Sequence, residues 1–186
     1  YVGKGLSGGK IIVKPGENLN FIPHNNIIIG NTVLYGATSG ELFANGQAGE
    51  RFAVRNSGAN AVIEGCSNNG CEYMTGGNVV ILGNVGENFA AGMTGGMAFI
   101  YDPMNEFDMY VNPSSVIWQN LETSYWKNFL KDLIKEHLKE TDSKIAQKIL
   151  ENFDEECHAF KQVCPKEMLD KLSNPLSLKK NISEAV

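Results

Sequence analysis

The stretch TGGNVVILG, residues 75–83, decides the fold, because similar stretches recur along the first half of the chain. Each copy has a short polar residue, one or two glycines and then an apolar run. The copies begin at residues 7, 38, 56, 75 and 94, and their closing glycines are 31, 18, 19 and 19 residues apart. The residues four positions after these glycines are all apolar: Val13, Ala44, Val62, Ile81 and Ile100.

A fixed short period with β-branched runs and glycines is typical of a solenoid, in which each repeat packs against its neighbours. A coil of 18 or 19 residues accommodates about three short strands of ~5 residues and their corners. The sequence therefore predicts a parallel β-helix, and the usual handedness of parallel crossovers makes it right-handed. We expect Gly58, Gly77 and Gly96 to stack at corners that favour glycine.

The composition changes abruptly near Asp102. All 20 glycines lie at or before Gly96, and charged residues are much denser after Asp102. Apolar residues from Trp126 to Leu138 then recur with a helical period, which predicts a helix. A second helix is expected to start after a cap at Asp142 or Ser143 and to continue through residues 157 and 160, stopping before residue 165.

These patterns divide the chain into three parts. We expect a β-helix domain over residues 1–102 and an α-helical extension over 103–172 that packs on or caps it. A last helical turn is expected around Met168, Leu169 and Leu172. Residues 173–186 have the polar composition of a disordered tail.

Composition and charge exclude several classes of protein. The net charge of −5 and the pI near 5.2 argue against a nucleic-acid surface, which needs clustered Lys and Arg. No apolar run approaches the ~18 residues of a membrane span, and no signal peptide is recognised. Four cysteines without an evident pairing favour an intracellular location, cytoplasmic or organellar, over secretion. Because the chain opens on Tyr1, almost inside the first repeat, we expect it to be a piece of a longer polypeptide.

Two glycine motifs match parts of phosphate-binding motifs, but their sequence context argues against both. Gly3, Gly5 and Gly8 match the spacing of the dinucleotide fingerprint, but that motif needs a preceding strand and a following helix. The Gly9-Lys10 pair lacks the first glycine and the following Ser or Thr of a phosphate loop.

The side chains that could carry chemistry give no site either. Cys66 and Cys71, and Cys157 and Cys164, lack the spacing and the further ligands of a metal site. His24, His137 and His158 have no Ser or Cys at a spacing that indicates a nucleophile and base. The sequence therefore predicts no catalytic, cofactor-binding or metal-binding residue in this chain.

Two further groups of side chains, one aromatic and one charged, have structural interpretations. The aromatic side chains of Trp118, Tyr125 and Trp126 are expected in the core. The densest charge of the first half leaves open an interdomain ion-pair surface or a structural network; it consists of Glu50, Arg51, Arg55, Glu64 and Glu72.

Several stretches together resemble a known family. They are GKGLSGGKIIV (3–13), NIIIGN (26–31), LYGATSG (34–40), GERF (49–52), VRNSGA (54–59), GCEYMTGG (70–77) and NFAAGMTGG (88–96). They are similar to the carboxy-terminal β-helix (GXGXG) domain of the glutamate synthase large subunit. The resemblance is dense over residues 1–102 and looser through residues 111–113 and the two helices.

The resemblance implies a multidomain oxidoreductase that transfers the amide nitrogen of glutamine to 2-oxoglutarate, with electrons from NAD(P)H or ferredoxin. It implies that FMN and an iron–sulfur cluster lie in other domains, and that this domain is a noncatalytic scaffold for the amidotransferase and FMN-binding domains. It places none of the family's catalytic or cofactor residues on this chain. The N-terminal edge of the β-helix is expected to be open to self-association.

A second class of function stays open at this point. The chain would then be a free-standing β-helix, either a transferase or a subunit resembling the β-helix subunit of formylmethanofuran dehydrogenase. A transferase of this kind is expected to have a reactive His in a groove and a hexapeptide period, whereas the period here is 18 to 19 residues.

Overall fold

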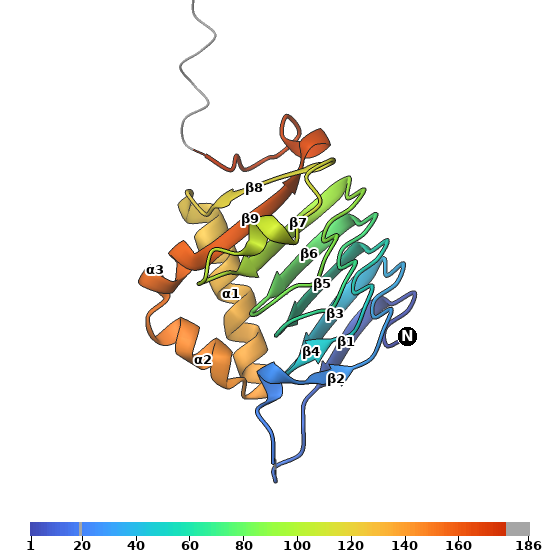
Figure 1. The fold of residues 1–186 in the computed structure, drawn as a ribbon, viewed down its shortest axis with the longest axis vertical. Coiled ribbons are helices and arrows are strands. Elements are labelled where there is room, and N and C mark those ends of the chain that lie inside the picture. Colours follow the sequence, from blue (N-terminus) through green and yellow to red (C-terminus); the bar gives the residue numbers. More distant parts are fainter. Residues whose placement is uncertain (19, 178–186) are drawn as a thin grey trace, which may run out of the picture.

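The computed structural model describes residues 1–18 and 20–177, and it confirms a parallel β-helix followed by short helices (Figure 1). Five of its strands, one from each coil, lie parallel in the main sheet. They are β1 (Ser7–Val13), β3 (Ser39–Ala44), β5 (Ser57–Ile63), β6 (Thr75–Ile81) and β7 (Gly95–Tyr101). On a second face, β2 (Ile27–Ile29) pairs in parallel with β4 (Gln47–Ala48). A 3-10 turn, η1 (Pro23–Asn25), precedes β2.

The register of the coils differs by one residue from the predicted alignment. Val62 pairs with Val80, so Ile63 rather than Val62 aligns with Ile81. The reason is a bulge after Ser57, which gives that coil one extra residue. Gly96 does stack on Gly77, as expected, but Ala59 and not Gly58 lies against Gly77 on the other side.

A third segment of each coil has a backbone in which every second residue is left-handed. We call residues 32–36, 51–55, 69–73 and 88–92 the left-handed strip. Its positive-φ residues are Thr32, Leu34, Gly36, Arg51, Ala53, Arg55, Asn69, Cys71, Tyr73, Asn88, Ala90 and Gly92. A non-glycine residue costs about 1–2 kcal/mol in this conformation.

Hydrogen bonds between coils hold the left-handed strip in place. In the third coil, Ala53 N donates to Val33 O of the coil before (2.9 Å). Arg55 N donates to Glu72 O of the coil after (3.0 Å). The strip therefore continues the stacking of the coils without extended strands, because its backbone groups alternate between the two neighbours.

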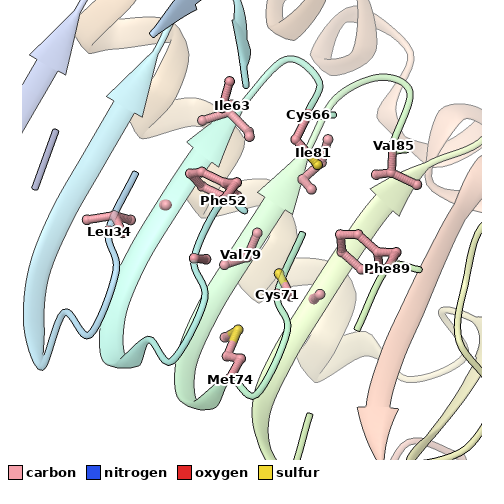
Figure 2. Packing of buried hydrophobic residues seen from close by; sticks show 14 of the residues in the cluster. Leu34, Phe52, Ile63, Cys66, Cys71, Met74, Val79, Ile81, Val85 and Phe89 are labelled. Carbon is pink, nitrogen blue, oxygen red and sulfur yellow. The ribbon is translucent and has the colours of Figure 1, made fainter. Parts of the chain in front are cut away.

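The strands from β3 to β7 are buried on both faces of the main sheet. Adjacent residues near their carboxyl ends are therefore apolar, and not only every second residue. Side chains such as Val79 and Ile81 point into the coils, where they meet Leu34, Phe52, Cys71 and Phe89 of the strip (Figure 2). Their neighbours on the opposite face form a second core with the helices; it includes Phe43, Val62, Val80, Phe99, Leu130, Ile134 and Ile149.

Helix α1 (Ser124–Thr141) confirms the predicted apolar stripe and packs across this outer face of the sheet (Figure 1). Thr123 caps its start, and Asp142 ends it in a left-handed conformation. Ser143 caps α2 (Lys144–Glu151) by accepting a hydrogen bond from Ala146 N. Of the two predicted caps, Ser143 is therefore the one that starts the second helix.

The second helix is shorter than predicted. After α2 come α3 (Phe153–Glu156) and the 3-10 turn η3 (Cys157–Ala159), and the chain then enters strand β9 (Phe160–Pro165). The extension of the helix through residue 160 was wrong, because β9 pairs antiparallel with β7 and satisfies an edge that would otherwise expose its backbone groups.

The segment after residue 103 is therefore not purely helical. Strand β8 (Val116–Asn120) pairs antiparallel with β9, so two further strands continue the sheet past β7 (Figure 1). The 3-10 turn η2 (Phe107–Met109) precedes β8, and η4 (Lys166–Met168) matches the predicted last turn.

The packed part of the chain reaches further than residue 172. Trp126 Nε1 donates to Asn174 O (3.2 Å), and Gln119 Nε2 donates to Leu176 O (3.2 Å). We call the core inside the coils the inner core, and the core between the sheet and the helices the outer core. Leu176 is buried in the outer core. Residues 174–177 of the expected tail thus pack on α1 and β8, and residues 178–186 lie outside the described residues.

Candidate functional site

Three polar side chains that are far apart in the sequence meet beneath α1. The Nε2 atom of His137 lies 3.1 Å from Oε1 of Glu64, and the Ser143 hydroxyl donates a short hydrogen bond to the same oxygen. Glu64 is 1% exposed, and His137 and Ser143 are fully buried. We call Glu64, His137 and Ser143 the buried polar triplet.

Each member of the triplet comes from a different structural element. Glu64 directly follows β5, and its N–H donates to Gly46 O (3.0 Å). His137 lies on the buried stripe of α1, and Ser143 is the N-cap of α2. One carboxylate therefore joins both helices to the β-helix.

The geometry of the triplet differs from that of a nucleophilic catalytic triad. In a triad, the His stands between the Ser that attacks and the acid that orients the ring. Here Ser143 and His137 both contact Oε1 of Glu64, while the Ser143 oxygen accepts from Ala146 N. Because the three groups are also sealed from solvent, a substrate could not reach the Ser143 hydroxyl without separating α1 and α2 from the sheet.

The triplet is not fully satisfied. Oε2 of Glu64 and Nδ1 of His137 have no hydrogen-bond partner among the described residues. A buried polar group without a partner costs stability, so these two atoms destabilise the folded chain.

A second polar link lies beside the triplet. Thr141 Oγ1 donates to His137 O (2.6 Å), and Asn45 Nδ2 donates to Thr141 O (3.0 Å). Asn45 and Thr141 also line a surface cavity of about 680 Å³, whose other walls are residues 14–17, residues 21–24 and the corner of α1 and α2. Asn45, which directly follows β3, therefore holds the end of α1 through the Thr141 carbonyl.

Outside this buried region, exposed ion pairs fix α1 to the first strand. Lys10 Nζ lies 2.7 Å from Glu136, 2.9 Å from Glu140 and 3.5 Å from Glu41. The hydrogen bonds to Glu136 and Glu140 raise the pKa of Lys10, and the same contact lowers the pKa of Glu136.

The histidines do not form a site together. His24 lies in η1, where its carbonyl accepts from Gln47 Nε2 (2.8 Å), and His158 is exposed in η3. Only His137 contacts a described acidic side chain. The sequence placed it on an apolar stripe but could not indicate Glu64 as its partner, because 73 residues separate them.

The predicted charge cluster is split by the structure. Glu64 is buried in the triplet, whereas Arg51 and Arg55 are exposed on the left-handed strip and form no ion pair with any described residue. Among the aromatic residues, Trp126 and Trp118 pack on the two cores, but Tyr125 is 48% exposed. The expectation of a core position for Tyr125 was wrong.

The rejected phosphate motifs lie in a β context. Residues 3–6 lead directly into β1, which contains Gly8, Gly9 and Lys10 and continues to Val13. Gly3 and Gly5 have φ of 68° and lie in the same kind of left-handed backbone as the strip.

A comparison with protein families identifies the family of this chain. The family model described as "GXGXG motif" matches residues 1–166. The chain belongs to the GXGXG family.

Relatives of this GXGXG chain are glutamate synthases. It is 59% identical over 183 residues to "Glutamate synthase [NADPH] large chain" of Azospirillum brasilense, covering 98% of this chain and 12% of the relative. It is 51% identical to "Glutamate synthase [NADH]" of Schizosaccharomyces pombe, covering 90% of this chain and 8% of the relative. It is 50% identical to "Ferredoxin-dependent glutamate synthase, chloroplastic" of Spinacia oleracea, covering 89% and 10%. The resemblance to glutamate synthase is thus confirmed, and the chain spans about a tenth of these relatives.

The cysteines of the GXGXG chain do not fit an iron–sulfur cluster, which needs four convergent thiolates. Cys66 and Cys71 belong to the inner core, and Cys157 and Cys164 to the outer core on the other side of the sheet. Burial raises the pKa of Cys66 to about 12 and that of Cys164 to about 11, and it also raises the pKa values of Cys71 and Cys157. All four therefore remain protonated at neutral pH.

The described part of the chain contains neither a group of metal ligands nor a membrane-spanning helix. Within residues 1–18 and 20–177, no three His, Cys, Asp or Glu side chains are grouped as metal ligands. In the same residues, none of the helices has both the length and the hydrophobicity needed to cross a bilayer.

Proposed function

We propose that this chain is a noncatalytic structural domain of a glutamate synthase large chain, in which it holds the catalytic domains together. The observation that carries this proposal is the buried polar triplet. The one constellation of Ser, His and Glu found in the described residues is sealed from solvent, and it joins the helices to the β-helix.

The names of the relatives support the same conclusion. Relatives named for NADPH, NADH and ferredoxin as electron donors match this chain over nearly its whole length, at 59%, 51% and 50% identity. A region that bound the donor would be expected to differ among enzymes that use such different donors. A structural role is compatible with all three.

The activity of the whole enzyme comes to this chain only as a proposal. We propose that it is part of a polypeptide that forms glutamate from glutamine and 2-oxoglutarate. The FMN and the iron–sulfur cluster of that reaction would be held by other domains, since the four cysteines described above do not fit a cluster. Its partners would be the amidotransferase and FMN-binding domains of the same polypeptide.

The purified chain tests this proposal. We expect no visible absorption from flavin or iron–sulfur after reconstitution and gel filtration, and no release of ammonia from glutamine. Bands that stay with the protein, or ammonia released in proportion to it, would contradict a purely structural role.

Self-association is a further proposal about the purified chain. Strand β1 stands at one end of the sheet, and Ile12 on it is 42% exposed. An exposed edge strand recruits other strands, so light scattering over a dilution series is expected to show more than a monomer. A monomer at every concentration would contradict it.

A further inference from the structure

The chain contains only two arginines, and both lie on one coil of the left-handed strip. Arg51 and Arg55 have φ of 60° and 55° and exposed side chains. Neither guanidinium forms a hydrogen bond or an ion pair with a described residue. Two always-charged side chains are thus presented to solvent without partners among residues 1–18 and 20–177.

The backbone at Arg55 is one that favours glycine. Its N–H donates to Glu72 O of the next coil, just as Gly36 N donates to Val54 O and Gly5 N to Tyr35 O. Three of the other four equivalent positions, Gly5, Gly36 and Gly92, are glycine, which adopts positive φ without strain. Buried strip residues such as Leu34 and Cys71 contribute to the core from this conformation, whereas the side chain of Arg55 is exposed, so packing does not account for an arginine here.

Tyr73 occupies the same position in the next coil. Its φ is 52°, and its side chain is 56% exposed. The ring lies over the following glycine of the column, because a Cβ on Gly92 would stand 2.5 Å from Tyr73 Cε1. Arg55 and Tyr73 thus occupy equivalent positions on neighbouring coils, in a column that otherwise consists of glycine. We call Arg51, Arg55 and Tyr73 the Arg–Tyr patch.

Three carboxylates lie near the patch, and one is engaged within the chain. Glu72 Oε1 accepts from Asn88 Nδ2 (3.1 Å), while Glu50 and Glu87 are exposed. None of the three forms an ion pair with either arginine in the described structure. The arginines are therefore available to carboxylates from outside the chain.

We propose that the Arg–Tyr patch docks onto a carboxylate-bearing surface of another domain of the same polypeptide. Arg binds carboxylates in a bidentate manner, and Arg and Tyr are enriched among the residues that dominate interface energies. A domain of the same polypeptide is the occupant because the relatives are about ten times longer than this chain. This inference rests on the proposed structural role and names the surface that performs it.

The first test measures how accessible the two arginines are to an arginine-specific dicarbonyl reagent. Peptide mass spectrometry follows Arg51 and Arg55 in the isolated chain and in the full-length enzyme. We expect both to react in the isolated chain and to react at least about tenfold more slowly in the enzyme, the factor that corresponds to about 1.4 kcal/mol. Equal rates in both would overturn the proposal.

Hydrogen exchange on the same two samples separates this inference from the proposed function. If residues 51–55 and 69–73 are unprotected in the enzyme but another surface of the chain is protected, the structural role stands and the patch is wrong. If no surface gains protection, the structural role fails as well.

A variant with a matched control provides the second test. Arg55→Gly removes the guanidinium and relieves the backbone, so the isolated chain should stay at least as stable. In the full-length enzyme it should accelerate exchange at residues 69–73 and proteolytic release of this domain. Lys148→Gln removes an exposed positive charge on α2 and should change neither. Unchanged exchange and release in the Arg55→Gly enzyme would contradict docking through this patch.

Discussion

The two faces of the main sheet are both buried, but they are built in different ways. The inner face packs against the coil itself, with side chains that recur every 18 or 19 residues, such as Ile63, Ile81 and Ile100. The outer face packs against α1 and α2, and every buried side-chain atom without a partner in the described residues belongs to it. These atoms are in Glu64, His137 and Gln162. The core built from repeats therefore leaves no buried polar side-chain atom without a hydrogen-bond partner in the described residues. The core assembled from distant segments contains polar groups that link those segments to one another.

The largest effect is expected on the inner face, from Gly77→Val. Gly77 has φ of 82°, and its added Cβ would stand 2.3 Å from Ala59 O. Strain of roughly 1–3 kcal/mol then adds to overpacking of roughly 1–3 kcal/mol. Gly9→Val is the matched control, because φ is 77° there but no atom lies within 4 Å. Urea unfolding should show a much larger loss for Gly77→Val than for Gly9→Val, and equal losses would contradict the stacked geometry.

On the outer face, Glu64→Leu should cost about 3 kcal/mol of unfolding free energy, because it leaves His137 buried without its partner. Adding His137→Phe removes the stranded group and should recover a large part of this loss. Unfolding in urea of the two single variants and the double variant gives the coupling energy. Strictly additive effects would mean that Glu64 and His137 do not stabilise each other.

Alkaline pH distinguishes the thiols of the two faces. Burial raises the pKa from 9.0 to about 12 for Cys66 on the inner face and to about 11 for Cys164 on the outer face. Each thiol's contribution is complete below pH 9 and is lost as pH rises through the folded pKa, because the unfolded chain releases the proton first. Each should reduce stability by about 1.4 kcal/mol per pH unit within its window.

The comparison is made with Cys66→Ala and Cys164→Ala. Removing Cys66 should flatten the pH dependence of stability over a wider alkaline range than removing Cys164. Urea midpoints measured from pH 8 to about pH 12 cover both windows, which differ only above about pH 11. If neither variant changes the slope, the thiols are less buried than the structure indicates.

The smallest effect is expected for the exposed attachment of α1. Lys10 contacts three carboxylates, but its side chain is 32% exposed. Lys10→Met should lower the thermal midpoint slightly, and the difference should vanish at high salt because surface pairs are screened. A large loss that persists in salt would place α1 attachment on this cluster and not on the buried triplet.

The inner face could be predicted from the sequence because its signal is local. The interval between glycines predicted the coils. On the outer face only α1 has a signal as local as this, the i, i+3, i+4 spacing from Trp126. The one-residue slip at Val62 was missed because Ala59 is an extra residue in an otherwise even period. Spacing alone does not show which residue of a coil forms a bulge.

The outer face could not be predicted in the same way. Cys157 and Phe160 fit a helical period, but residues 160–165 instead form a strand that pairs with the edge of β7. Glu64, His137 and Ser143 each have an ordinary local interpretation, as a charge, a stripe residue and a cap. Their meeting depends on tertiary packing, which no short motif encodes. The left-handed backbone at Arg51 and Arg55 was likewise hidden, because arginine is not a residue that indicates positive φ.

Ser143→Ala in the full-length enzyme tests most directly whether the buried polar triplet is structural and not catalytic. Loss of the cap should lower the unfolding free energy by about 1 kcal/mol, while turnover per folded molecule and flavin content stay unchanged. Ser143→Thr, which keeps a capping hydroxyl, should recover much of the stability. If turnover instead falls at least about a hundredfold, the loss of a catalytic group, in an enzyme that remains folded, the buried polar triplet takes part in the reaction and the account is wrong.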